Sequence, residues 1–185
     1  MAPKLRLTSE EYLEQFPEHK TSSVLFLLYP SDEKTYFVLI ERTSGDGVHS
    51  GQISLPGGKH EAGDKSYWNT AVRETEEEIG VNKKEMHFAG QLTDLFIPAS
   101  KFRVYPHVGY ILHTAEFVPN KNEVKKVIHA DLKTFLSGKT KFEKEFITSY
   151  GKLPAPYFKY QDYEIWGATA MIISEFISLF KSENN

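Results

Sequence analysis

Residues 58–81 read GKHEAGDKSYWNTAVRETEEEIGV, a glycine-containing loop followed by a helical pattern. The helix is expected to begin near Ser66 and to end at Gly80, a favourable C-cap. Because an α-helix turns about 100° per residue, one face carries three carboxylates, those of Glu74, Glu77 and Glu78. A different, mostly apolar stripe can pack on a core, and it consists of Trp68, Ala71, Val72, Thr75 and Ile79.

The three glutamates have two interpretations. Close carboxylates repel one another, and a hard divalent cation would remove that repulsion, since Mg²⁺ prefers oxygen ligands. Like charges one turn apart cost only about 0.2–0.5 kcal/mol per pair, so an ordinary solvated face is the alternative. The helix alone leaves the choice open, and the surrounding residues have to decide it.

The whole stretch resembles the Nudix box, in which a glycine and a glutamate precede the sequence Arg-Glu-apolar-x-Glu-Glu-x-Gly-apolar. Gly58 supplies the glycine, Asp64 stands for the first glutamate, and residues 73–81 form the tail. Asp64 is itself a departure, eight residues rather than seven precede Arg73, and Thr75 replaces an aliphatic residue. The resemblance implies an α/β fold of the α+β type, an α/β/α sandwich around a central mixed β-sheet. It also implies hydrolysis of a diphosphate linked to another group.

The flanking sequence is most similar to the coenzyme A diphosphatase subfamily. The segments that carry this likeness are residues 38–43, 49–58, 105–109, 122–124 and 166–170. Departures from the subfamily pattern occur at Thr43, Leu55 and Glu61, and Gly47 stands where the subfamily motif has a second arginine. A guanidinium is a natural phosphate clamp, so Gly47 bears on recognition of coenzyme A more than on hydrolysis.

Size and composition predict one globular domain. The 185 residues suffice for a real core and predict one domain over 1–185. The resemblance implies that this is a Nudix domain, with a helical extension at 1–20 and the box at 58–81. A net charge of −3 gives no reason to expect nucleic acid as a partner. Cysteine is absent, which excludes disulfides and thiol catalysis. We expect no membrane partner and a cytoplasmic location, because no signal-peptide or membrane-spanning apolar run is present.

Hydrophobic periodicity predicts the remaining elements. Residues 22–29 and 35–42 are expected to form a hairpin, and the final helix should bury Met171, Ile172, Phe176, Ile177 and Phe180. Further strands are expected at 52–55, 86–96, 104–113 and 124–130, a short helix at 131–136, and a late hairpin at 141–148 and 156–165.

By the resemblance, Glu74, Glu77 and Glu78 hold Mg²⁺ or Mn²⁺, and the backbone carbonyl of Gly58 adds a ligand; a simple tight turn is the alternative for this glycine. Arg73 orients a box carboxylate, and the carboxylate of Asp64 either caps the helix or tethers that arginine.

The remaining candidate residues have more than one interpretation. The general base is open between Glu78 and Glu123, a loop residue that is otherwise an ordinary surface glutamate. Glu77 is grouped with the catalytic residues Arg73, Glu78 and Glu123. Arg42 and Lys59 are candidates for phosphate contact, with solvated surface charges as the alternative.

The leading hypothesis is Mg²⁺-dependent cleavage of coenzyme A or acyl-coenzyme A to 3′,5′-ADP and 4′-phosphopantetheine. One alternative is hydrolysis of another nucleoside diphosphate derivative such as ADP-ribose. Another is a non-catalytic domain of the same fold that only binds a ligand. The expected partner is a small nucleoside diphosphate derivative, and assembly as a homodimer is left open.

Overall fold

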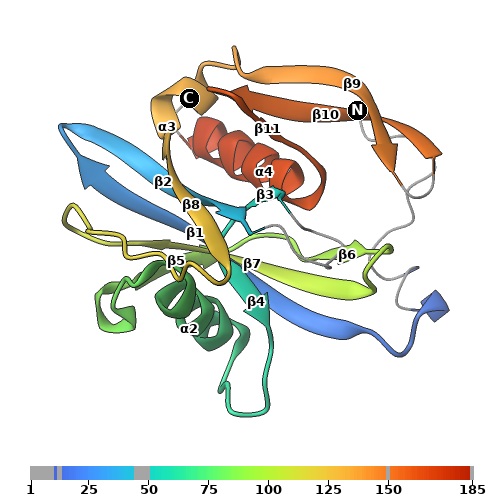
Figure 1. The fold of residues 1–185 in the computed structure, drawn as a ribbon, viewed down its shortest axis with the longest axis horizontal. Coiled ribbons are helices and arrows are strands. Elements are labelled where there is room, and N and C mark those ends of the chain that lie inside the picture. Colours follow the sequence, from blue (N-terminus) through green and yellow to red (C-terminus); the bar gives the residue numbers. More distant parts are fainter. Residues whose placement is uncertain (1–10, 12–13, 44–50, 149–150, 184–185) are drawn as a thin grey trace.

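The computed structural model describes residues 11, 14–43, 51–148 and 151–183, and a mixed β-sheet lies between helices at its centre (Figure 1). The elements in chain order are β1 (Lys20–Ser31), β2 (Lys34–Arg42), β3 (Ile53–Ser54), β4 (Gly57–Lys59), α2 (Tyr67–Ile79), the 3₁₀ turn η1 (Lys83–Glu85), β5 (His87–Gln91), β6 (Leu95–Ile97), β7 (Phe102–Tyr110), β8 (Val124–Asp131), α3 (Leu132–Leu136), β9 (Lys141–Thr148), β10 (Gly151–Tyr160), β11 (Tyr163–Ile165) and α4 (Gly167–Glu183). This arrangement confirms the predicted fold class.

Strand β1 is the centre of the sheet. It runs parallel to β7 from Lys20 to Leu28 and pairs antiparallel with β2, so the sheet is mixed. The path through the sheet is β3-β2-β1-β7-β5, with β8 beside β2, β6 beside β7 and β4 beside β1. The predicted hairpin is confirmed, because Ser31 pairs with Lys34 across its turn.

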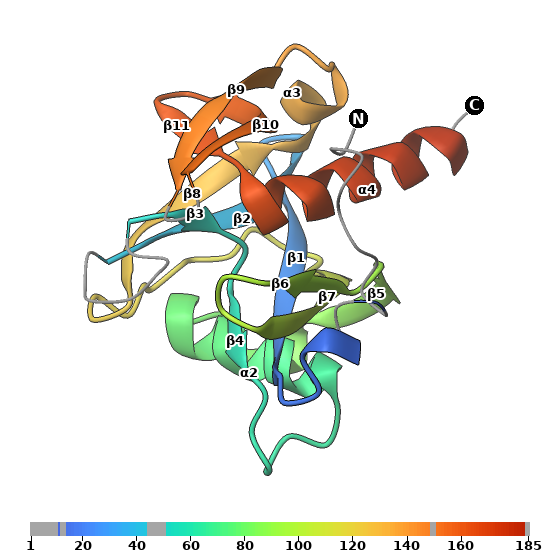
Figure 2. The same ribbon diagram turned by 90° about the vertical axis from the view of Figure 1, so that its right-hand side faces the viewer.

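Side chains that alternate along β1 enter two separate cores. Leu25 and Leu27 pack on one face of the sheet in the cluster that includes Ala71, Val72 and Ile79 of α2. Phe26 points to the opposite face, where α3 and α4 supply the other cluster. Successive strand residues face opposite sides of a sheet, so one apolar strand can bury both of its faces. Figures 1 and 2 show α2 on one side and α4 on the other.

The sheet divides along β1, and this division positions the glycine strand. β2 pairs with β1 only at its Leu28–Ser31 end. At the opposite end of β1, β4 pairs with the edge that β2 has left, with Gly57 opposite Val24 and Gly58 opposite Ser23. The Leu25 N–H donates to the Pro56 carbonyl between the two pairings, over 2.9 Å. This division places the glycine strand β4 and the end of β2 beside the helix α2.

The predicted strand at 86–96 is wrong in its continuity, because it consists of β5 and β6. Between them the Leu92 N–H donates to the Pro106 carbonyl, and Thr93 is bound through its backbone and hydroxyl to Glu175. The late hairpin also differs, since its second half contains two strands, β10 and β11. Gln161 has a positive φ of 53° at the turn between them.

The final helix buries a stripe that differs from the predicted one. Ala170, Ile172, Ile173 and Phe176 are buried, whereas Met171 is 38% and Phe180 is 40% exposed. Ile173 therefore replaces Met171 in the stripe. Figure 2 shows the C-terminal end of α4 extending past the sheet, which accounts for the exposure of Phe180.

The predicted helical extension at 1–20 lies mostly outside the described residues. Residues 11, 14 and 15 are helical, and Lys20 already belongs to β1. Across the described part of the chain, no helix has both the length and the apolar character needed to cross a membrane.

Candidate active site

The box helix α2 has the boundaries that the sequence predicts. Ser66 is its N-cap and accepts the Asn69 N–H on its hydroxyl, while Gly80 ends it in the left-handed conformation at φ 76°. A side-chain oxygen at the N-cap satisfies an amide that the helix leaves unbonded. Because Ser66 performs this function, Asp64 is left for another partner.

Two glycines bring the backbone of β4 close to this helix. Gly57 has a φ of 143°, and a Cβ there would lie 2.3 Å from the Ser23 carbonyl oxygen. A Cβ on Gly58 would lie 2.4 Å from the carboxylate carbon of Glu74. Backbone contact and a positive φ require glycine at Gly57, whereas a side chain at Gly58 would displace the Glu74 carboxylate.

Glu78 is fully buried, so the alternative of an ordinary solvated face does not apply to this glutamate. Its Oε2 accepts the Gly57 N–H over 2.8 Å, and its Oε1 lies 2.9 Å from Arg42 Nη1 in an ion pair without hydrogen-bond alignment. Burial raises the pKa of Glu78 to about 7, against the opposing effects of Arg42 and the Gly57 N–H. Removing a carboxylate from water disfavours its charged form.

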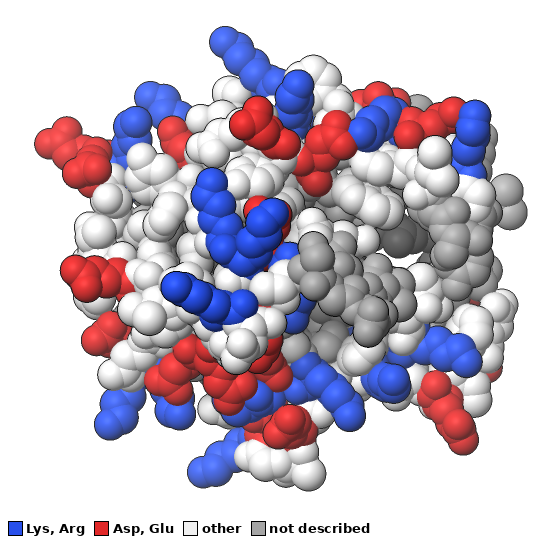
Figure 3. Space-filling view, viewed as in Figure 1, with Lys and Arg blue, Asp and Glu red and all other residues white. Residues whose placement is uncertain are grey.

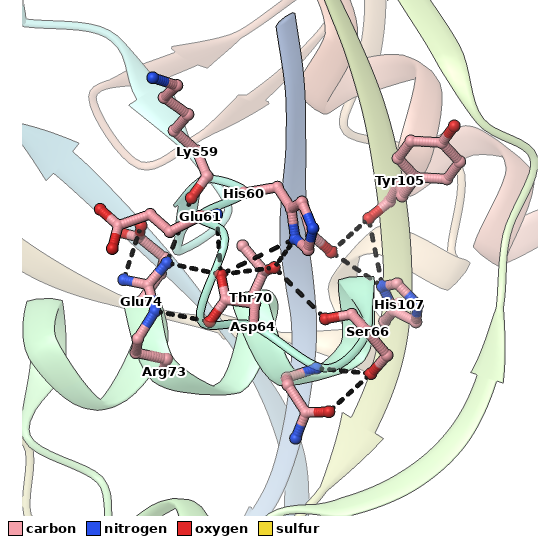
Figure 4. Close-up of polar contacts among 12 residues, drawn as sticks. Lys59, His60, Glu61, Asp64, Ser66, Thr70, Arg73, Glu74, Tyr105 and His107 are labelled. Carbon is pink, nitrogen blue, oxygen red and sulfur yellow. Dashed lines mark hydrogen bonds and ion pairs between the residues drawn. The ribbon is translucent and has the colours of Figure 1, made fainter.

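Arg73 is the centre of a polar cluster that is separate from the contacts of Glu78 (Figure 4). Its Nε and Nη2 donate to the two carboxylate oxygens of Asp64, each over 2.9 Å, and Nη2 also donates to the Lys59 carbonyl. Nη1 lies 3.0 Å from Glu74 Oε1 and donates to Glu77 Oε2 over 3.1 Å. The hydrogen-bonded guanidinium holds the pKa of Asp64 well below its usual range. Asp64 therefore tethers the arginine.

Glu74 and Glu77 differ in exposure although one guanidinium contacts both. The side chain of Glu74 is 15% exposed and that of Glu77 is 53% exposed. Burial raises the pKa of Glu74, Arg73 opposes this, and the charges of Glu77 and Glu123 add to it. A cation close to Glu74 would favour its ionised form.

Glu123 lies on the loop before β8 and acts electrostatically on α2. Its charge adds to the raised pKa of both Glu74 and Glu78, so its carboxylate lies near enough to act on both. Its Oε1 accepts from Asn120 Nδ2 over 3.1 Å, and the Asn120 N–H donates to the Glu78 carbonyl over 2.9 Å. Asn120 therefore connects the end of the box helix to Glu123.

Of the two residues predicted to contact phosphate, Arg42 contacts a box carboxylate through its side chain, whereas Lys59 contacts the site only through its backbone carbonyl. Arg42 pairs with Glu78 while 31% of its side chain remains exposed. Lys59 contributes its carbonyl to Arg73, and Figure 4 shows its side chain directed away from the Asp64–Arg73 pair. On the face seen in Figure 3, acidic side chains gather where Figure 1 places α2, and basic side chains lie directly above them.

The residues at this site fit a hard divalent cation by type. Carboxylates and a backbone carbonyl are the oxygen donors that Mg²⁺ and Mn²⁺ favour, and the Gly58 hydrogen leaves space that the Glu74 carboxylate fills. Among the described residues, however, no three acidic or histidine side chains already form a metal-ligand group. Arg73, Arg42 and the Gly57 N–H hold the carboxylates, so a cation would compete with them.

Two residues of the site were missed from the sequence, Thr70 and Asn120. Thr70 is fully buried and donates to Asp64 Oδ2 over 2.9 Å. A threonine inside a helix gives no local signal for such a contact. Asn120 accepts the Asn122 N–H on its side chain, a turn that asparagine favours and that could have been predicted.

A hollow of about 280 Å³ opens beside the end of β2, and Glu41, Gln52, Tyr163 and Trp166 are among its lining residues. The Gln52 carbonyl also accepts the Arg42 N–H over 3.2 Å. Aromatic surface is therefore available close to the strand end that carries Arg42.

The site consists of an acidic helix packed beside a glycine strand on a mixed sheet. The chain belongs to the Nudix family, because the NUDIX domain model matches residues 19–147. The chain is 36% identical over 161 residues to Nudix hydrolase 15, mitochondrial, of Arabidopsis thaliana, covering 83% of this chain and 56% of that protein. It is 32% identical over 143 residues to the uncharacterized Nudix hydrolase NudL of Photorhabdus laumondii, covering 77% of this chain and 75% of that protein. The alignment thus spans about half the length of the plant relative.

Solved structures show the same fold. A MutT/nudix family protein from Enterococcus faecalis superimposes with a TM-score of 0.58 at 16% identity, over 96% of this chain and 71% of that chain. A MutT protein from Methanosarcina mazei Go1 gives 0.56 at 19% identity, over 90% and 96%.

Proposed function

We propose that this chain is a divalent-metal-dependent hydrolase that cleaves the diphosphate of a nucleoside diphosphate derivative. The observation that supports this best is the approach of Glu74 and Glu78 to the Gly57–Gly58 strand, with Glu123 linked through Asn120 to the end of the same helix. Carboxylate oxygens grouped beside a glycine strand suit the binding of a hard cation, which would favour their ionised forms.

Diphosphates resist hydrolysis because their negative oxygens repel an attacking nucleophile. Bound Mg²⁺ or Mn²⁺ would neutralise these oxygens and lower the pKa of a water molecule. On our proposal, the carboxylates of Glu74, Glu77 and Glu78 hold the ions together with the Gly58 carbonyl. Arg73 restrains Glu74 and Glu77 by one oxygen each, which leaves the second oxygen of each carboxylate to another partner.

Two residues remain candidates for the base that takes the proton from water. Glu78 is buried beside the Gly57 N–H, and burial raises its pKa to about 7 in the absence of a cation. Glu123 lies on a loop and is held by Asn120. The partly exposed guanidinium of Arg42 can contact a substrate phosphate while it pairs with Glu78.

For the substrate we propose coenzyme A or acyl-coenzyme A, cleaved to 3′,5′-ADP and 4′-phosphopantetheine or its acylated form. This rests on the subfamily-like segments at residues 49–58, 122–124 and 166–170. Gly47, where that subfamily has arginine, supports a second candidate, another nucleoside diphosphate derivative such as ADP-ribose. Cytoplasmic location and a homodimer stay predictions.

A substrate screen tests this proposal. Purified protein with Mg²⁺ is incubated with coenzyme A, acetyl-coenzyme A, ADP-ribose, a dinucleoside polyphosphate and ATP, and products are identified by mass spectrometry. We expect 3′,5′-ADP from coenzyme A, abolished by EDTA. Cleavage of ADP-ribose with coenzyme A untouched would overturn the substrate. Ligand binding by calorimetry without any turnover would overturn the hydrolase and favour a binding domain.

A further inference from the structure

Thr70 joins two segments of the box through one buried hydroxyl. Its Oγ1 lies 2.9 Å from Asp64 Oδ2, 3.3 Å from the Ser66 carbonyl and 2.7 Å from His60 Nδ1 (Figure 4). The residue itself is fully buried on α2. One side chain of the helix thereby contacts both the residue that follows β4 and the carboxylate that tethers Arg73.

The directions of these hydrogen bonds follow from the number of protons. A threonine hydroxyl has one proton to donate, and both the Asp64 carboxylate and the Ser66 carbonyl can only accept. The hydroxyl therefore donates to the closer of them, Asp64 Oδ2, and His60 must donate from Nδ1. The structure thus fixes the proton of a neutral His60 ring on Nδ1.

Packing holds the His60 ring in the position that this hydrogen bond requires. The ring meets Tyr67 edge-on, with centroids 4.8 Å apart. Tyr67 in turn stacks on Tyr105 at 3.8 Å with an interplanar angle of 8°. The imidazole is therefore a fixed donor, and Thr70 transmits its position to Asp64.

Asp64 has its donors on both oxygens. Oδ2 accepts from Thr70, from the Glu61 N–H over 3.0 Å and from Arg73 Nη2, while Oδ1 accepts from Arg73 Nε. Without the Thr70 hydroxyl, this carboxylate would lose its contact with the helix interior. The partly exposed His60 side chain would also lose the acceptor of its Nδ1–H.

We propose that His60 and Thr70 form a positioning pair, which fixes Asp64 and through it the guanidinium that gathers Glu74 and Glu77. The inference rests on the proposed metal-dependent function, and it assigns to the pair an effect on cation affinity. Residues that orient the ligands of a metal without touching it commonly change affinity or activity by about 10–100-fold when mutated.

The test compares the Mn²⁺ affinity of three variants with that of wild type. Electron paramagnetic resonance measures this affinity in the absence of substrate. Thr70→Val removes the hydroxyl at nearly constant volume, whereas Thr70→Ser keeps the hydroxyl and removes only the methyl group. Thr75→Val is the matched control, because Thr75 is equally buried on the same helix but donates only to the Ala71 carbonyl, over 2.7 Å. We expect Thr70→Val to weaken Mn²⁺ binding at least about tenfold, and Thr70→Ser and Thr75→Val to stay close to wild type.

A second pair of variants keeps the test independent of the helix interior. His60→Asn places an amide N–H near the position of Nδ1, whereas His60→Gln extends the amide beyond it. We expect His60→Asn to retain more of the Mn²⁺ affinity than His60→Gln. Thermal unfolding in EDTA is recorded for every variant, since a purely structural role would lower stability without changing the Mn²⁺ affinity of the folded protein.

The outcomes separate the two proposals. Wild-type protein that binds Mn²⁺, with Thr70→Val binding it equally well, would overturn the positioning pair alone. Equal weakening by Thr75→Val would overturn it as well, because the effect would then belong to the helix packing. Wild-type protein that neither binds Mn²⁺ nor hydrolyses any diphosphate would overturn the proposed function together with this inference.

Discussion

The Gly57 backbone N–H donates to Glu78 Oε2 over 2.8 Å and joins the glycine strand to the box helix inside the protein. A backbone N–H can only donate, so it favours the ionised form of Glu78, which burial disfavours. Arg42 supplies the second favourable contact, at Oε1. Glu78 is therefore held between a strand, a glycine turn and its own helix, in one orientation.

We expect Glu78→Gln to reduce turnover by about a hundredfold or more, the scale of a general base, with little change in folding. Glutamine keeps the volume and an oxygen for the Gly57 N–H, but it can neither ionise nor hold a divalent cation well. The measurement is kcat at saturating Mg²⁺, beside thermal unfolding in EDTA. Glu76→Gln is the control, since Glu76 on the same helix binds Lys83 instead. A near-normal rate for Glu78→Gln would contradict its assigned role.

We expect Gly58→Ala to reduce turnover by more than tenfold while the protein stays folded, because the added methyl must displace the Glu74 carboxylate 2.4 Å away. The backbone φ at Gly58 lies outside the left-handed region, so the substitution adds volume without backbone strain. Gly63→Ala is the matched control, since its Cβ would meet nothing within 4 Å. The check is kcat together with the Mg²⁺ concentration for half-maximal rate, and equal behaviour of the two variants would refute the contact.

Local signals in the sequence predicted the box helix well. Ser66 and Gly80 mark its ends because capping depends on residues next to one another in the chain. The hairpin of β1 and β2 was predicted for the same reason, from two β-rich runs separated by a short turn. The mixed sheet followed from the family resemblance.

The burial of Glu78 could not be predicted in this way. It depends on Gly57 and Arg42, which reach the helix only because the sheet divides along β1. Helical periodicity places Glu78 beside Glu74 but does not show which side of that face meets the sheet. The same limit explains Met171, since nothing local distinguishes it from Ile173 as the residue that faces the core.

We expect Glu123→Gln to slow turnover at least about tenfold if this residue is the general base. Asn120→Ala should have a smaller effect, because it removes the 3.1 Å hydrogen bond that holds the carboxylate. In the Glu123→Gln background, Asn120→Ala should have no further effect on kcat, which is the expected behaviour of two residues acting through one carboxylate. Glu116→Gln is the control, as an exposed glutamate of the same connection. Unchanged kcat for Glu123→Gln would assign the base to Glu78.

His107 should make the free energy of unfolding depend on pH. It is buried beside Ser23, with its Nδ1 3.0 Å from the serine hydroxyl, and burial lowers its pKa from the ordinary 6.5. The unfolded chain then binds the proton more readily than the folded protein. The contribution of His107 to stability is therefore full above about pH 6.5, the unfolded value, and it declines as the pH falls below that value.

We expect His107→Gln to lower stability at pH 7.5 by about 1 kcal/mol, a typical size for a buried substitution, and to make the variant lose less stability than wild type on acidification from pH 7 to 5. Glutamine does not titrate, so the contribution of this group to the pH dependence disappears. Urea unfolding in EDTA at several pH values measures the slope. His87→Gln removes an exposed imidazole from the neighbouring strand β5 and should leave the wild-type slope unchanged. If His107→Gln and wild type lost stability in parallel on acidification, the acid sensitivity would arise elsewhere in the protein.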